Sequence, residues 1–274
     1  GYDGIVTMEN KHDPFLPLAV AAIATERVEL ATGIAISFAR SPMSAANQAW
    51  DLNEASRGRF MLGLGTQVKA HNEKRFSAPW TPPAPRMREM VQFIKATWHS
   101  WKTGEQLNYE GEHYRVTLMP PNFVPEPLAG PPPALTIAAV GPGMMKVAAE
   151  ECDGVRLHPF STRKYLEESA LPRINAGLPA GVGKRENFEV SGGGFIATGS
   201  TDEAVEAKRA TVSAAGIVPS TGGAPSPDLC VRSVACTIGD IDVAVAVGGW
   251  RQETHGRLAR DLTEVANVAD FAIL

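Results

Sequence analysis

The hydrophobic pattern of this chain alternates between short buried strands and amphipathic helices. Residues 28–36 are an almost unbroken apolar run rich in β-branched side chains, which is typical of a strand buried on both faces. A helix is predicted next, with Ser44 as its N-cap and Gly58 as its left-handed stop. A second apolar strand follows at 60–65. Together these elements predict a βαβ unit, whose crossover is right-handed in nearly all known cases.

The same alternation continues on both sides of this unit. It predicts further strands at 5–8, 134–140, 153–157 and 188–198, and further helices at 15–25, 87–101, 141–151 and 163–174. An extended arm or hairpin within 102–122 and a proline-rich stretch at 120–133 interrupt the pattern. Because so many prolines cannot join a central sheet, we expect this stretch to be a surface connector. The fold class is therefore α/β with a parallel sheet.

Composition restricts the function more than the fold. The chain has 274 residues, of which 20% are charged, and its net charge of -4 provides no basic field for nucleic acid. No apolar run approaches the roughly 20 residues of a membrane span, and no signal peptide opens the chain. The three cysteines lack C-x-x-C spacing, so we expect no disulfide framework and no zinc or other metal site. These features favour a cytoplasmic protein that binds a small organic molecule.

Polar loops follow several of the predicted strands. The loop after strand 5–8 contains Glu9, His12 and Asp13; Asp13 is expected to cap a helix, whereas Glu9 and His12 are equally consistent with a solvated loop and with chemistry. Another polar loop spans 66–71. The turn 141–143, Gly-Pro-Gly, opens a helix after a buried strand and would point free backbone N–H groups at an anion. These loops predict one site at the carboxyl edge of the sheet.

Several familiar motifs fail on their context. Residues 192–197 satisfy G-x-G-x-x-A but lie inside a predicted strand and open no helix, so a dinucleotide fingerprint is not supported. The chain has no complete phosphate-binding P-loop, no G-x-S-x-G elbow and no H-E-x-x-H motif. Hydrolase and metalloenzyme interpretations are therefore weak.

The longest stretch of motif resembles a known family. Residues 31–67, ATGIAISFARSPMSAANQAWDLNEASRGRFMLGLGTQ, are similar to the signature of the bacterial-luciferase-like monooxygenase superfamily. GYDGIVTMENKHDPF and AAVGPGMMKVAAEECDGVRLHPF fit the same family, and more narrowly its branch of oxidoreductases that use the deazaflavin coenzyme F-420. The resemblance covers residues 1–211. It implies a (β/α)8 TIM barrel with the cofactor at the carboxyl ends of the strands.

Position by position, the resemblance implies a set of site residues. A non-prolyl cis peptide against the cofactor ring is expected within residues 35–37, a phosphate-binding turn at 139–144, and contacts to the polar edge of the cofactor at 66–71. Glu9 or His12 is implied as the proton acceptor. The implied catalytic residues are Glu9, His12 and His71, and the implied cofactor-binding residues are Ala35, Ile36, Ser37, Thr66, Gln67, His71, Ala139, Val140, Gly141, Pro142, Gly143 and Met144.

The reaction implied by the resemblance depends on the cofactor. A deazaflavin has carbon at the central ring position, so hydride transfer between an organic substrate and that carbon is favoured, with a nearby base taking the substrate proton. An FMN-dependent monooxygenase on the same barrel is the alternative. A non-catalytic barrel is a second alternative, because this superfamily includes relatives that bind cofactor poorly. Relatives are often dimers, so a homodimer is a further expectation.

The sequence departs from the family at both ends. The first βα unit is absent, and the expected final strand does not appear beyond about residue 211. We therefore divide the chain into a barrel domain, 1–211, and a divergent tail, 212–274, for which an out-of-frame origin is one hypothesis and a last strand at 241–247 is the other. Without these neighbours, strands 5–8 and 188–198 would be exposed edges, so we expect the chain to be prone to self-association.

Overall fold

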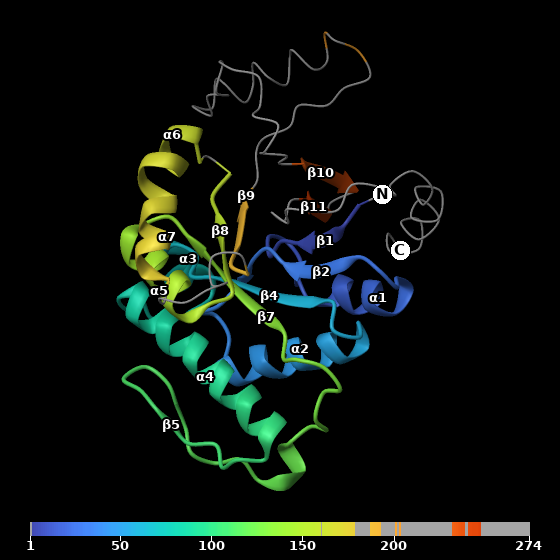
Figure 1. Cartoon of the computed structure of the whole chain (residues 1–274), viewed down its shortest axis with the longest axis vertical. Helices are drawn as coiled ribbons and strands as arrows, with labels where there is room; N and C mark the ends of the chain where they lie inside the picture. The colour runs from blue at the N-terminus through green and yellow to red at the C-terminus, as the bar shows by residue number, and fades with distance from the viewer. Residues whose placement is uncertain are drawn as a thin grey trace.

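Nine of the described strands form one curled, mostly parallel sheet in the computed structural model (Figure 1). The structure describes residues 2–159, 161–178, 187–192, 201 and 203 and the backbone of 232–238 and 241–247. The strand order is β10-β11-β1-β2-β4-β7-β8-β9, with β3 also paired to β4. These strands are β1 (Gly4–Thr7), β2 (Glu29–Thr32), β3 (Ala35–Ile36), β4 (Phe60–Gly65), β7 (Ala134–Ala139), β8 (Gly154–Leu157), β9 (Glu189–Gly192), β10 (Arg232–Ile238) and β11 (Ile241–Val247).

Helices connect the parallel strands and cover the outside of the sheet. They are α1 (Leu16–Ala24), α2 (Pro42–Ala55), α3 (Lys69–Arg75), α4 (Pro83–Thr103), α5 (Pro142–Glu151), α6 (Arg163–Tyr165), a π-helical turn (Leu166–Ala170) and α7 (Leu171–Gly177). Five of the six parallel pairings, those along the path β1-β2-β4-β7-β8-β9, carry the βα alternation that the sequence predicted. The predicted fold class is confirmed: this is a curled part of a (β/α)8 barrel.

The main core lies between the sheet and helices α2 and α4. The predicted apolar stripe of α4 is buried, and Trp98 and Trp101 are among the largest fully buried side chains. Trp101 packs edge-on against Trp50 of α2 at 5.3 Å between ring centroids. The Trp98 indole N–H donates to the Ala46 carbonyl at 3.1 Å. These contacts fix α2 and α4 to each other.

The start of α2 differs from the prediction. Ser41, and not Ser44, is the N-cap, because its hydroxyl accepts the N–H of Met43 and Pro42 occupies the first helical position. A serine followed by proline is a strong helix start, since the missing proline N–H would have no partner there. The predicted stop is confirmed, with Gly58 in the left-handed region at φ +85°.

The predicted strand 28–36 is divided into β2 and β3. β2 pairs Ala31 with Met61 of β4, and β3 pairs Ala35 with Leu64. Between these two pairs the chain of β2 and β3 advances four residues, from 31 to 35, whereas β4 advances three, from 61 to 64. The segment between β2 and β3 therefore contains one extra residue. The break is therefore a bulge, which the uniform apolar pattern could not reveal.

Gly63 makes the bulge possible. A Cβ on Gly63 would lie 2.0 Å from the Thr32 carbonyl oxygen, so only glycine admits this close approach of the two backbones. The Thr32 hydroxyl then donates to the Gly63 carbonyl at 2.7 Å and accepts the Gly63 N–H at 2.9 Å. Gly63 therefore allows the backbone of β2 to approach β4 closely.

The tail contributes a strand at the predicted position. β11 pairs with β1 through Val6 with Ala244 and Thr7 with Val243, antiparallel to the barrel strands. The expectation that strand 5–8 is an exposed edge is therefore wrong at these positions, because β11 occupies that side. Among the described strands no pairing joins β9 to β10, so this sheet does not close into a ring. The predicted continuation of β9 to residue 198, and the tail outside β10 and β11, lie outside the described residues.

The insertion between α4 and β7 contains the predicted hairpin. Its strands are β5 (Tyr109–Glu110) and β6 (Arg115–Val116), followed by a 3-10 turn (Pro121–Phe123). The Glu89 carboxylate on α4 accepts the N–H groups of His113 and Tyr114 at 2.7 and 3.1 Å, which ties the hairpin turn to the helix. Within the described part of the chain, no helix has the length and apolar character to span a membrane.

The bulge yields a stability prediction. Gly63→Ala places a methyl group against the Thr32 carbonyl, so we expect it to lower the free energy of unfolding by about 3 kcal/mol or more. Gly130→Ala is the matched control, because a Cβ there meets nothing within 4 Å, and it should change stability by no more than about 0.5 kcal/mol. Chemical denaturation measures both. Equal stabilities of the two variants would contradict the close approach.

Candidate active site

Four polar segments lie at the carboxyl edge of the parallel strands. Three of them follow β1, β4 and β7, and the fourth consists of β3 and Ser37, beside the end of β4. The loop after β1 also contacts α3, because Arg75 donates to the Asn10 carbonyl at 2.5 Å. The structure thus brings the segments 9–13, 35–37, 66–71 and 139–144, which carry all the predicted site residues, to one edge of the sheet.

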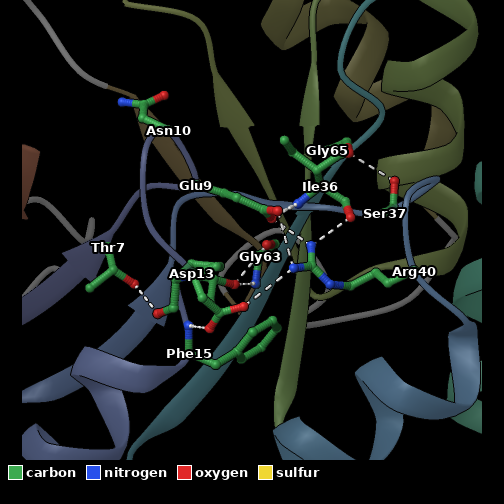
Figure 2. Close-up of polar contacts among 12 residues, drawn as sticks. Thr7, Glu9, Asn10, Asp13, Phe15, Ile36, Ser37, Arg40, Gly63 and Gly65 are labelled. Carbon is green, nitrogen blue, oxygen red and sulfur yellow. Dashed lines mark hydrogen bonds and ion pairs between the residues drawn. The ribbon is translucent and has the colours of Figure 1, made fainter. Parts of the chain in front are cut away.

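Glu9 is held by Arg40, a contact that the sequence did not indicate. Glu9 Oε2 accepts from Arg40 Nη1 at 2.5 Å and Glu9 Oε1 accepts from Nη2 at 3.1 Å, which is a two-point ion pair (Figure 2). Both side chains are mostly buried, with exposed fractions of 11% for Glu9 and 15% for Arg40. Arg40 stands in the R-x-P motif before α2, and nothing in that motif indicates a carboxylate partner 31 residues away.

The same two side chains bind the backbone of Ile36. Glu9 Oε2 accepts the Ile36 N–H at 2.6 Å, and Arg40 Nη1 donates to the Ile36 carbonyl at 2.6 Å (Figure 2). Both oxygens of Glu9 are therefore already engaged. The role of Glu9 as a proton acceptor stays a prediction, and the contacts supply a second role, in holding β3. His12, the other candidate, is exposed in the same loop.

Asp13 bonds the backbone at the start of α1, as the sequence predicted, although α1 begins at Leu16 and its N-cap position is Phe15. Its Oδ1 accepts the N–H groups of Phe15 and Leu16 at 2.8 and 3.2 Å, just before α1. Its second oxygen lies 3.6 Å from Arg40 Nη2. The Thr7 hydroxyl donates to the Pro14 carbonyl at 2.6 Å, so the loop after β1 is bonded at both ends.

The cis peptide bond lies between Gly33 and Ile34. The prediction that it falls within residues 35–37 was wrong by two residues, because a non-prolyl cis bond carries no marker in the sequence. The side chains of Ala35, Ile36 and Ser37 are fully buried. The Ser37 hydroxyl donates to the Gly65 carbonyl at 2.8 Å, and the residues of this segment that reach the surface are the half-buried Gly33 and Ile34.

The loop after β4 is organised by Asn72, which sequence reasoning missed. The Asn72 amide donates to the carbonyls of Thr66 and Val68 at 2.9 and 3.1 Å, and the side chain is fully buried. Gln67 between them adopts φ +57°. His71 is exposed on α3. A lone asparagine in a polar helix carries no sequence signal for such a role.

The amino end of α5 is open. Gly141 is its N-cap, no side chain caps it, and Pro142 has no N–H, so the N–H groups of Gly143 and Met144 have no intrahelical acceptor. Gly141, Pro142 and Gly143 are exposed, Met144 is half-buried, and a Cβ on Gly141 would meet nothing within 4 Å. This arrangement suits a phosphate or another anion. Of the two residues before it, Ala139 is buried and Val140 is exposed.

A separate cavity of about 780 Å³ opens at the opposite, amino end of the strands. Burial raises the pKa of Glu189 and lowers the pKa of Arg156 in this cavity, and the attraction between the two charges opposes both shifts. The Arg156 side chain lies against Gly33, where an added Cβ would come within 2.6 Å of Nη1. No predicted site residue lines this cavity.

One group of described side chains has the composition of a metal site. Glu89, Glu112 and His113 have ligand atoms within 4.8 Å of one another. The Glu89 oxygens already accept the N–H groups of Glu112, His113 and Tyr114. This cluster is explained by its structural role in the hairpin.

Known proteins resemble this chain in both sequence and fold. The sequence model described as luciferase-like monooxygenase matches residues 1–263. The chain is 48% identical over 202 residues to the uncharacterized protein Rv1360 of Mycobacterium tuberculosis, covering 74% of this chain and 59% of that protein. It is 30% identical over 188 residues to the 5,10-methylenetetrahydromethanopterin reductase of Archaeoglobus fulgidus, covering 69% and 53%.

A solved structure resembles the fold. The coenzyme F-420-dependent tetrahydromethanopterin reductase of Methanopyrus kandleri superimposes with a TM-score of 0.59 at 20% identity, covering 78% of this chain and 64% of that one. At this identity the likeness shows the fold alone. The chain spans a little over half the length of the two curated relatives above, 59% and 53%.

The buried amide of Asn72 yields a prediction for the loop after β4. Asn72→Asp replaces a donor by a carboxylate that faces two carbonyl oxygens, so we expect stability at pH 7 to fall by about 2 kcal/mol or more. The new carboxyl would have a raised pKa when folded. The folded variant therefore holds its proton more tightly, and its stability is lost as the pH rises above about 4.

Asn47→Asp is the matched control, because Asn47 is exposed on α2. It should show no comparable loss between pH 4 and pH 7. Thermal or chemical unfolding at several pH values measures both variants. A pH dependence of Asn72→Asp that equals that of the control would remove Asn72 from this role.

Proposed function

Because the chain belongs to the luciferase-like monooxygenase family, we propose that it is an oxidoreductase that transfers a hydride between an organic substrate and the deazaflavin coenzyme F-420. The observation that carries the proposal is the open amino end of α5 at the same sheet edge as the bulge that ends in β3. A cofactor with a phosphate and a flat ring would use both features, the N–H donors for the anion and the irregular backbone beside the ring.

The residues present fit such a cofactor. The donors at Gly143 and Met144 are unpaired within the helix, and the exposed Gly141 leaves room for close approach of a phosphate. The half-buried Gly33 and Ile34 would face the flat ring, and the fully buried residues 35–37 would support them from beneath. Thr66, Gln67 and His71 lie at the next strand end and are proposed to meet the polar edge of the ring.

The bound deazaflavin would supply the carbon that accepts or donates the hydride. The chain would orient the substrate and remove its proton. His12 is the better candidate for the proton acceptor, because it is exposed in the loop after β1, whereas both oxygens of Glu9 are occupied by Arg40 and Ile36. The substrate is a small organic molecule in this proposal.

An FMN-dependent monooxygenase is the second candidate, and the description of the family itself favours it. The same phosphate and ring contacts would serve FMN. A barrel that binds neither cofactor is the remaining alternative. We further propose that the chain forms a homodimer and that it is located in the cytoplasm. We also propose that it consists of a barrel domain followed by a separate tail.

Titration of the purified chain with F-420 and with FMN, followed by fluorescence, tests the proposal. We expect F-420 to bind more tightly than FMN. Preferential binding of FMN, with oxygen consumption when the flavin is reduced, would favour the monooxygenase. Binding of neither would favour the non-catalytic barrel.

The turn before α5 yields a more local prediction. Gly143→Val places a branched side chain in front of the anion donors, so we expect the dissociation constant of the cofactor to rise by about tenfold or more while circular dichroism is unchanged. Gly141→Val should act in the same direction. The control is Gly130→Ala, which lies outside the site segments. Unchanged affinity in folded Val variants at both positions would remove this turn from the site.

A further inference from the structure

The contacts of Glu9 and Arg40 are concentrated on one backbone unit. β3 pairs on one side with β4, through Ala35 with Leu64 and Ile36 with Gly65. On its other side β1 has already ended at Thr7. The Ile36 N–H and carbonyl that face this side are bonded by Glu9 and Arg40. The two side chains therefore take the place of a neighbouring strand.

The surroundings of Arg40 hold its guanidinium in one orientation. The pair with Glu9 has two parallel contacts, which fix both the plane and the direction of the group. Asp13 Oδ2 lies 3.6 Å away, and the Phe15 ring centroid lies 5.4 Å from Cζ. Asp13 and Phe15 belong to the loop after β1, so the guanidinium joins that loop to β3.

From this geometry we infer that Arg40 and Glu9 are a positioning pair for the segment 34–37. The pair holds the buried backbone of Ile36, which supports the half-buried Ile34 at one wall of the cofactor site, and neither side chain removes the substrate proton. The inference rests on the proposed function, because the segment matters for activity only if a cofactor lies against it. It assigns Glu9 a different role from the proton acceptor implied by the family resemblance.

A positioning role and a catalytic role for Glu9 predict different effects of substitution. If Glu9 acts only through Arg40, then Glu9→Gln and Arg40→Gln should weaken cofactor binding to a similar extent. The double variant should be no worse than either single one, because each single change already breaks the pair. A catalytic base would instead lose turnover and its limb of the pH profile while cofactor affinity stayed constant.

The experiment is a double-mutant cycle on the full chain, with F-420 as the probe and FMN in parallel. We expect each single variant to raise the dissociation constant by about 10- to 100-fold, since small displacements of a site wall have effects of this size. Arg40→Lys keeps the charge but not the two-point contact, so it should restore affinity only in part. If Arg40→Gln does not fold, Arg40→Lys takes its place in the double-mutant cycle.

Two controls make the result specific. Arg115→Gln removes an exposed arginine on the β5–β6 hairpin and should leave affinity unchanged. Hydrogen exchange of the segment 33–38 without cofactor should be faster in both single variants, because the Ile36 N–H loses its fixed acceptor. The pH profile of the residual activity should keep the shape of the wild-type profile.

The outcomes separate this inference from the proposed function. If the wild-type chain binds neither F-420 nor FMN, the proposed function and the inference both fail. If the wild type binds and Arg40→Gln binds equally well, the inference alone fails. Loss of one pH limb in Glu9→Gln with unchanged affinity would make Glu9 the proton acceptor and would also overturn it.

Discussion

The close approach of the Thr32 carbonyl to Gly63 is the constraint on which the carboxyl edge of this sheet depends. It allows one extra residue between β2 and β3, and the Thr32 hydroxyl satisfies the backbone groups of Gly63 that the interrupted ladder leaves there. β3 consequently lies against the last residues of β4 with its other side free of a strand. Glu9 and Arg40 bond that free side, which links the bulge to the loop after β1.

The strands and helices were largely predictable because they follow from the periodic pattern of apolar residues. The apolar stripe of α4 and the runs of β4 and β7 predicted their positions to within a few residues, and Gly58 predicted the end of α2. The errors fell where the cause is local or non-periodic. Ser41 instead of Ser44 caps α2 because of the adjacent proline, and the bulge occurs within a run whose side chains are uniformly apolar.

The candidate site was predictable in place but not in detail. Polar loops after parallel strands must gather at one edge, so Glu9, Thr66 and Gly141 could be placed there from the sequence. The partners that organise them could not. Arg40 and Asn72 act through contacts with distant or backbone groups, and such contacts leave no spacing pattern in the chain. The antiparallel pairing of β11 with β1 was equally hidden, although the strand itself was anticipated.

We propose that the cofactor binds at the carboxyl edge of the sheet and not in the cavity at the amino end of the strands. Hydrogen-exchange mass spectrometry of the full chain, with and without saturating F-420, tests this most directly. The account predicts that F-420 slows exchange in the segments 33–38, 66–72 and 139–146 and leaves the cavity segments 58–61 and 153–156 unchanged. Slower exchange around the cavity, with no change at the carboxyl edge, would contradict it.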